Sequence, residues 1–263
     1  MAKFTTFYSG SSGNCAYVEE NGKYLLIDMG KSCRITTTAL KTMGCSISDL
    51  CGILITHEHS DHISGLNVFL KKYKVPVYGA AATLDYLYDH NLVPQTAELV
   101  AIDGRSEEIG AFTVSGYETS HDSVACLGYR IKTQSGKVAS IATDLGYVSD
   151  EVLANLYMAD LVSLEANYDA HMLKTGAYPY YLKKRIESTQ GHLCNDESAI
   201  IVSRLVSNGC KRIALCHSSK ENNTQELIYK AVKCALIKDG VIPSADCIIQ
   251  VAQRYEISPI LEF

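Results

Sequence analysis

Four potential metal ligands lie within six residues of this chain, in the stretch His57-Glu58-His59-Ser60-Asp61-His62. The stretch directly follows the apolar run 51–56, which is typical of a buried strand and would hold the ligands rigidly. Imidazole and carboxylate suit zinc, manganese or iron, and the lack of thiolate disfavours a closed structural zinc site. The alternative is a polar loop whose histidines have no function. Four ligands packed this tightly at a strand end favour a metal site.

The spacing within this stretch indicates how its ligands are shared. In an extended segment, side chains two apart point the same way, so we expect His57, His59 and Asp61 on one side. His62 breaks this alternation. Using both Asp61 and His62 requires a bend in the chain, and a turn into a helix at residues 64–66 would place two pairs of ligands around two neighbouring ions.

Three further candidate ligands follow later apolar runs. Each is a polar residue at the carboxyl end of a predicted strand, where α/β enzymes tend to collect their chemistry. Considered alone, any of them could be a solvated loop residue, but together with the first stretch they favour a dinuclear site. They are His121 after the run 112–117, Asp144 after 138–143 and His217 after 212–216.

Predicted strands and helices alternate without a long linker or repeat, which indicates one domain covering residues 1–263. Asn21-Gly22 is a strong tight-turn signal and predicts a hairpin between 16–18 and 24–28. The pattern suits two mixed sheets face to face with helices outside, an α/β (α+β) four-layer αββα sandwich. Further strands are expected at 75–78, 112–117, 127–132, 138–142, 161–164 and 212–215, and helices at 34–43, 81–88, 152–157, 196–206 and 224–236.

Length and composition fit a globular protein, because 263 residues with 47% hydrophobic content can bury a large core. No apolar run is long enough to span a bilayer and the N-terminus has no signal-peptide core, so we expect a cytoplasmic protein without a membrane partner. Ten cysteines scattered singly, with no Cys-x-x-Cys pair, predict reduced thiols. The net charge of -5 argues against a broadly basic nucleic-acid binder but allows a local basic groove. The pattern gives no sign of oligomeric state.

With Asp28 ending an early predicted strand, the ordered ligand set resembles that of the metallo-β-lactamase-fold hydrolases over nearly the whole chain. The resemblance implies the αββα sandwich and a division of the ligands between two metals. It implies that His57, His59 and His121 hold one metal, that Asp61, His62 and His217 hold the other, and that Asp144 bridges them. Asp28 would support the ligand loop without binding metal. Alternatively, it is a strand-terminal carboxylate in a turn before Gly30.

Four other segments, 9–14, 164–169, 191–195 and 215–223, resemble the YycJ (WalJ) family. This resemblance implies a DNA exonuclease that works from the five-prime end. The 73 positions between Asp144 and His217 (217 minus 144) are too few for the inserted cap domain of the β-CASP nucleases. One departure is Cys194, where the family commonly has Ser.

Two divalent cations bridged by hydroxide would lower the pKa of that water and stabilise charge on the oxygens of a phosphodiester. Asp61 could orient or deprotonate the nucleophile as well as bind metal. His192, a non-ligand histidine ahead of a predicted helix, is the candidate proton donor or phosphate contact. Glu165 could polarise His192 or a ligand imidazole. The alternative for His192 is a loop histidine without a catalytic part.

Residues 178–185, Tyr-Pro-Tyr-Tyr-Leu-Lys-Lys-Arg, interleave aromatic and cationic side chains shortly before His192. Such a run can stack bases and hold a phosphate backbone, and it can equally be an amphipathic helix with a solvated basic face. The Gly/Ser-rich residues 9–14 could offer amides and hydroxyls to a terminal phosphate but lack the lysine of a P-loop. The candidate substrate contacts are Ser11, Ser12, Asn14, Tyr181, Lys183, Lys184 and Arg185.

The leading hypothesis is a nuclease with two divalent metal ions, zinc or manganese, that acts on DNA from the five-prime end. Only the family resemblance favours DNA over RNA as the nucleic-acid partner. A second hypothesis is a hydrolase of a small phosphodiester or thioester, which the same metal centre could run. A third, a non-enzymatic metal-bearing regulatory protein, would require a broken site, whereas all seven ligands are present.

Overall fold

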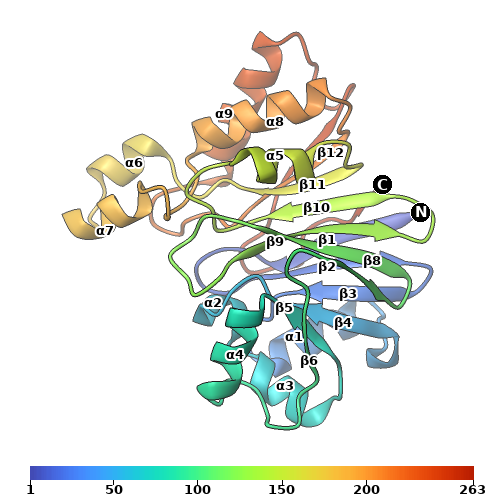
Figure 1. The fold of residues 1–263 in the computed structure, drawn as a ribbon. Helices are drawn as coiled ribbons and strands as arrows, with labels where there is room; N and C mark the ends of the chain where they lie inside the picture. The colour runs from blue at the N-terminus through green and yellow to red at the C-terminus, as the bar shows by residue number, and fades with distance from the viewer.

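Two seven-stranded sheets pack face to face in the computed structural model, which describes residues 1–263 (Figure 1). Helices cover the outer face of each sheet, so the predicted αββα sandwich is confirmed. The first sheet has the order β14-β1-β2-β3-β4-β5-β6, with β1 (Ala2–Tyr8), β2 (Cys15–Glu20), β3 (Lys23–Ile27), β4 (Leu50–Leu54), β5 (Val77–Gly79), β6 (Leu99–Ala101) and β14 (Leu261–Glu262). The second has the order β13-β12-β11-β10-β9-β8-β7, with β7 (Ser106–Ile109), β8 (Phe112–Glu118), β9 (Leu127–Thr133), β10 (Val138–Ala142), β11 (Leu161–Glu165), β12 (Arg212–Cys216) and β13 (Ile248–Val251).

The helices fall into three groups in space. Those beside the first sheet are α1 (Cys33–Thr42), a 3-10 turn (Ile47–Asp49), α2 (Ser60–Ile63), α3 (Leu66–Lys72) and α4 (Ala81–Asp89). Those beside the second sheet are α5 (Asp150–Leu156), α8 (Asn195–Ser207) and α9 (Gln225–Lys238). The remaining pair, α6 (Ala170–Thr175) and α7 (Tyr180–Ile186), projects from one end of the sandwich, and we call residues 170–186 the arm (Figure 1). None of the helices has the length and apolar character needed to cross a membrane.

Each sheet is buried on both faces. Along β3, Tyr24 and Leu26 pack into the cluster beneath the helices of the first sheet, whereas Leu25 and Ile27 pack into the cluster between the two sheets. Alternate side chains of a strand point to opposite faces, so a strand buried on both faces is apolar throughout. A third cluster lies between the second sheet and its helices. The sheets are therefore held rigidly by three apolar layers.

The carboxyl ends of the parallel strands meet at one end of the sandwich. Strands β3 to β6 pair in parallel in the first sheet, and β10 to β13 do so in the second. Figure 1 shows the arrowheads of β3 and β10 at the same end as α2 and the arm. Loops that follow these strands are thus brought together although they come from distant parts of the sequence.

Several predicted elements are confirmed and one detail is wrong. Asn21 and Gly22, with φ of 54° and 80°, join β2 and β3 in the predicted hairpin. The predicted turn into a helix at 64–66 comes too late, because α2 begins at Ser60 and Asp61 therefore does not continue the extended alternation. The backbone is bent early because two neighbouring loops hold it, through bonds from Asn14 N to Asp61 O of 2.8 Å and from Met29 N to His62 O of 2.7 Å.

Candidate metal centre and substrate pocket

Three polar residues at or just beyond the ends of strands have left-handed backbone conformations. Asp28 after β3, Asp144 two residues after β10 and His217 after β12 have φ of 64°, 54° and 52°. This region is unfavourable for residues other than glycine, and such strain tends to occur at functional sites. All three side chains are buried at the end of the sandwich where the loops meet.

Asp28 fixes the loop that carries the first candidate ligands. Its Oδ1 accepts a hydrogen bond from Thr56 N at 2.8 Å, and its Oδ2 lies 2.7 Å from His62 Nδ1 and 2.9 Å from Thr56 Oγ1. A carboxylate on Nδ1 leaves Nε2 of the same ring for a metal and holds the ring in place. Gly30 packs against this loop, since a Cβ there would lie 1.7 Å from the carbonyl oxygen of Asp61.

Two sets of three candidate ligand side chains lie next to each other. The rings of His57, His59 and His121 are mutually 4.6 to 5.1 Å apart between centroids. In the second set, Asp61 Oδ2 lies 3.6 Å from Nε2 of both His62 and His217. Within each set, one possible ligand atom of every residue lies within 4.8 Å of those of the others.

Asp144 lies between these two sets. Its Oδ2 is 3.3 Å from Nε2 of His62, and its Oδ1 is 3.8 Å from Nε2 of His121. Its Oδ1 also lies 3.3 Å from Nδ1 of His217, so the carboxylate is close to members of both sets. The structure thus brings together all seven residues that the sequence singled out as ligands.

Three of these ligand atoms are buried and have no hydrogen-bond partner: His57 Nε2, Asp144 Oδ2 and His217 Nε2. An unpaired buried polar atom costs about 1–3 kcal/mol, so three in one cluster indicate a further bonding partner. Imidazole nitrogens and carboxylate oxygens are ligand atoms of divalent metals, and these residues therefore fit such ions.

The charges of the cluster also favour cations. Burial opposes a positive charge on His62, but the carboxylates of Asp144 and Asp28 outweigh it and raise the pKa of His62 to about 9. Burial likewise opposes a charge on His217, yet Asp144, Asp61 and Glu165 raise the pKa of His217 well above its usual value. Burial and neighbouring imidazoles lower the pKa of His57. The carboxylates therefore stabilise positive charge, carried by protons or by metal ions.

Glu165, at the end of β11, joins two histidines from different loops. Its Oε1 lies 2.8 Å from Nδ1 of His192 and 2.8 Å from Nδ1 of His217. Burial opposes ionisation of Glu165, but His192 and His217 outweigh it and lower the pKa of Glu165. His192 itself comes just before α8, whose N-cap is Cys194: its Sγ accepts from Glu197 N at 3.5 Å. The thiol thus takes the capping part that a serine hydroxyl would play.

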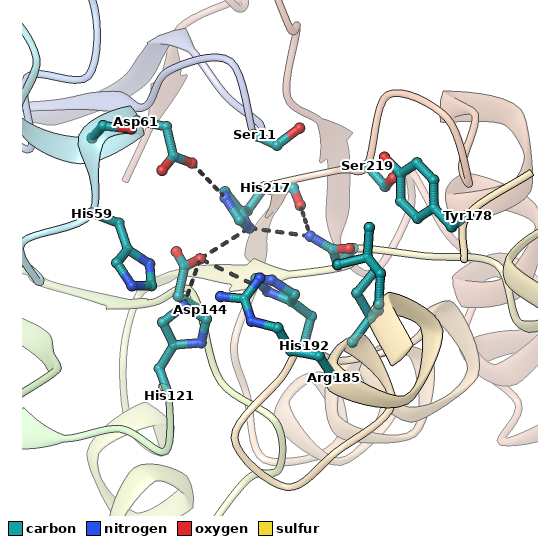
Figure 2. Close-up of a pocket in the computed structure, with 14 residues that line it drawn as sticks. Ser11, His59, Asp61, His121, Asp144, Tyr178, Arg185, His192, His217 and Ser219 are labelled. Carbon is teal, nitrogen blue, oxygen red and sulfur yellow. Dashed lines mark hydrogen bonds and ion pairs between the residues drawn. The ribbon is translucent and has the colours of Figure 1, made fainter. Parts of the chain in front are cut away.

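A pocket of about 340 Å³ opens onto the cluster, as Figure 2 shows. His59, Asp61, His121, Asp144, His192 and His217 form its floor, and Tyr178, Leu182 and Ile186 bring apolar surface from the arm. Arg185 is the only lysine or arginine that lines it. The pocket therefore combines a ligand cluster, an apolar wall and one cation.

The candidate substrate contacts are placed unequally. Ser11 and Arg185 line the pocket, whereas Tyr181 and Lys184 are exposed on α7 and do not line it, and Ser12 Oγ is buried without a partner. Lys183 donates to the carbonyl oxygens of Lys174 and Gly176 at 2.8 and 2.7 Å, so it closes the end of α6.

Asn14 does not line the pocket. Its Nδ2 is 3.0 Å from His62 Nε2, and its Oδ1 accepts from Gly10 N at 2.7 Å. The sequence placed Asn14 among the candidate substrate contacts, but in the structure its side chain bonds to His62 in the ligand loop and to Gly10.

Two polar pocket residues, Asn167 and Ser219, were missed from the sequence, as was Asp122, which lies outside the pocket lining. Asn167 Nδ2 donates to His217 O at 2.8 Å, and Ser219 lines the pocket beside Tyr178 (Figure 2). Asp122 directly follows His121 and pairs with Arg185. Asn167 and Ser219 lie in the segments that carried the family resemblance, and Asp122 gave the one local signal, a carboxylate beside a candidate ligand.

A family model described as a beta-lactamase superfamily domain matches residues 23–209. The chain belongs to the beta-lactamase superfamily. It is 36% identical over 239 residues to exodeoxyribonuclease YycJ of Bacillus anthracis, covering 90% of this chain and 90% of that relative. It is 37% identical over 230 residues to exodeoxyribonuclease WalJ of Streptococcus pneumoniae, covering 86% and 85%. The predicted resemblance to the YycJ (WalJ) family is thereby confirmed.

The fold of this superfamily member is also found among solved structures. The metallo-beta-lactamase fold protein YhfI from Bacillus subtilis superposes with a TM-score of 0.73 at 18% identity, covering 99% of this chain and 98% of that one. Together with the curated relatives and the ligand cluster, the family shows that the chain is a metal-dependent hydrolase that uses divalent metal.

Proposed function

We propose that this protein is a nuclease that binds two divalent ions, zinc or manganese, and hydrolyses DNA from the five-prime end. His57, His59 and His121 would hold one ion and Asp61, His62 and His217 the other, with Asp144 shared. The observation that carries this proposal is the position of Asp144, whose carboxylate lies within 3.8 Å of His121 in the first set and of His62 and His217 in the second. Asp28 supports the ligand loop from behind.

When bound, the ions lower the pKa of a water and stabilise negative charge on a phosphoryl oxygen. The chain's own residues orient the reactants. Asp61, whose side chain is 23% exposed, faces the pocket and can orient the attacking water. His192, fixed through Nδ1 by Glu165, also lines the pocket and can donate a proton to the leaving oxygen.

The substrate proposal rests on the relatives and on the pocket wall. Both relatives carry the name exodeoxyribonuclease and match along most of their length. Arg185 and Ser11 line the pocket and can contact phosphate oxygens. Because the site takes residues from both sheets, we propose that residues 1–263 act as one domain. The ten free cysteines suit a reducing compartment, which supports the cytoplasm as its location.

A small phosphodiester is the second candidate substrate. The observation that favours it is the modest pocket of about 340 Å³ with a single lining cation. The longer basic track expected from residues 183–185 is reduced to Arg185, because Lys183 binds carbonyl oxygens and Lys184 pairs with Glu187.

Metal-loaded protein, prepared separately with zinc and with manganese, should be incubated with DNA and RNA labelled at either end and with a bis-aryl phosphodiester. We expect stepwise release of nucleotides from the five-prime end of DNA. Faster hydrolysis of RNA than of DNA, or hydrolysis of the bis-aryl phosphodiester alone, would overturn the proposed substrate. Metal analysis showing fewer than two ions per chain after reconstitution would overturn the proposed centre.

A further inference from the structure

Arg185 on the arm and Asp122, in the loop after β8, form an ion pair with two contacts across the pocket wall. Arg185 Nη2 donates to Asp122 Oδ1 at 2.8 Å, and Nε donates to Oδ2. Two parallel bonds fix the plane of a guanidinium as well as its position. The residues are 63 positions apart, so the pair joins the arm to the body of the protein.

The pair leaves part of the guanidinium free. Nη1 of Arg185 makes no hydrogen bond to the protein, whereas Nε and Nη2 are both used by Asp122. Figure 2 shows the guanidinium turned into the pocket, on the side of His192 and Asp144. Arginine binds phosphate oxygens well, and a fixed guanidinium loses less entropy when it does so.

Asp122 is itself held firmly. Its backbone N donates to Gln190 O at 3.1 Å, and its Oδ1 lies 3.4 Å from His121 Nε2. Asp122 does not line the pocket, but a carboxylate beside a pocket for an anionic substrate repels that substrate, so charge alone would disfavour it there. The two bonds to Arg185 give a reason for a carboxylate at this position that its charge does not.

We propose that Asp122 is a positioning residue. It holds the guanidinium of Arg185 ready to bind a phosphate next to the scissile phosphate in the bound strand. The inference rests on the proposed nuclease function. The scissile phosphate has to lie over Asp144 and the histidines on the pocket floor. Arg185 belongs to the arm wall, and from there it reaches a neighbouring phosphate.

Charge and positioning predict opposite effects for Asp122→Asn. If Asp122 acted through its charge alone, removing the charge would tighten the binding of DNA. If it positions Arg185, the amide keeps the shape but loses one acceptor of the two-contact pair, and binding weakens. The direction of the change in Kd therefore separates the two roles.

The experiment uses metal-loaded protein and single-stranded DNA under single-turnover conditions, which give Kd and the cleavage rate separately. Each non-scissile linkage is replaced in turn by a neutral methylphosphonate, in wild type, Asp122→Asn, Arg185→Met and Arg185→Lys. Lys174→Ala, which removes an exposed charge on the arm outside the pocket, is the matched control. Thermal unfolding of every variant is measured in parallel.

We expect Arg185→Met and Asp122→Asn to raise Kd, by about tenfold for Arg185→Met, with little change in the cleavage rate. At one linkage, the methylphosphonate should weaken the binding of DNA to wild type and leave the binding to Arg185→Met unaffected. Compared with Arg185→Met, Arg185→Lys should restore the salt dependence of DNA binding but not the full affinity for DNA. Lys174→Ala should keep the wild-type response to every linkage.

Tighter binding by Asp122→Asn, or equal methylphosphonate effects in wild type and Arg185→Met at every linkage, would overturn the inference. So would a fall in cleavage rate and melting temperature without a change in Kd, which is the signature of a tether that only stabilises the arm. If wild type hydrolyses the bis-aryl phosphodiester but neither binds nor cuts DNA, the proposed function fails, and this inference fails with it.

Discussion

The carboxylate of Glu165 lies 2.8 Å from Nδ1 of His192, and the same oxygen contacts His217 at an equal distance. An ionised carboxylate only accepts hydrogen bonds, so both rings carry a proton on Nδ1. Nε2 of His217 is then left for a metal, and Nε2 of His192 for the substrate. One buried residue therefore sets the orientation of a candidate ligand and of the candidate proton donor.

His192→Ala should leave the metal content intact and lower the turnover number by roughly 10²-fold, the usual scale of general acid catalysis. The two proposed sets, His57, His59 and His121 with Asp61, His62 and His217, remain complete without His192, although His192 also lies in a possible ligand group with Asp144, Glu165 and His217. Metal analysis and steady-state kinetics on the same preparation check this. Loss of metal together with activity would instead make His192 a ligand, and an unchanged turnover number would make it a bystander.

Metal affinity should rise with pH across the neutral range. Asp144 and Asp28 raise the pKa of His62 to about 9, so this ring is protonated below that pH unless a metal replaces the proton. Each proton released on binding strengthens the apparent affinity by about tenfold per pH unit. Titration with a competing chelator between pH 6.5 and 8.5 measures the slope.

Asp28→Asn provides the matched comparison for the slope of metal affinity against pH. The amide removes one of the charges that stabilise protonated His62. Fewer protons should then be released near neutral pH, while the loss of ring support should weaken metal binding by about 10–100-fold. An affinity that does not change with pH in either protein would contradict the prediction.

Gly30→Ala should destabilise the protein by about 1–3 kcal/mol and lower its metal affinity. The added methyl group would lie 1.7 Å from Asp61 O and 2.5 Å from Asn14 N, so the ligand loop must move. Denaturant unfolding and metal titration measure the two effects. Gly79→Ala is the control, because its methyl group approaches no closer than 3.3 Å, to Ile55 O. Equal effects in both variants would show that the close approach at Gly30 is unimportant.

The sequence singled out the candidate ligands because their chemistry is local. His121, Asp144 and His217 each follow an apolar run, and together with the stretch 57–62 this residue type and position made them candidates. The layered fold followed from the alternation of apolar strands and amphipathic helices. These signals depend on neighbours in the sequence and need no knowledge of distant contacts.

What the sequence did not show depends on contacts between distant residues. Arg185 and Asp122 meet across 63 positions, and Asn14 reaches His62 across 48. The early bend at Ser60 follows from hydrogen bonds to loops elsewhere in the chain. Strand β14 has only two residues, too few to show a pattern, yet it pairs with β1. Such features require the tertiary structure.

Tyr181→Ala should weaken the binding of single-stranded DNA by about 1–3 kcal/mol, the scale of one base stacked on an aromatic ring. Tyr181 is 74% exposed and precedes Arg185 by four residues, so the two share one face of α7. Tyr180→Ala is the matched control: Tyr180 is equally exposed at 75%, but its ring lies under Lys184, 5.7 Å from Nζ, on another face. Fluorescence anisotropy with labelled oligonucleotides compares the two. If both variants lose the same affinity, or if neither does, bases do not follow the face of α7 that leads to Arg185.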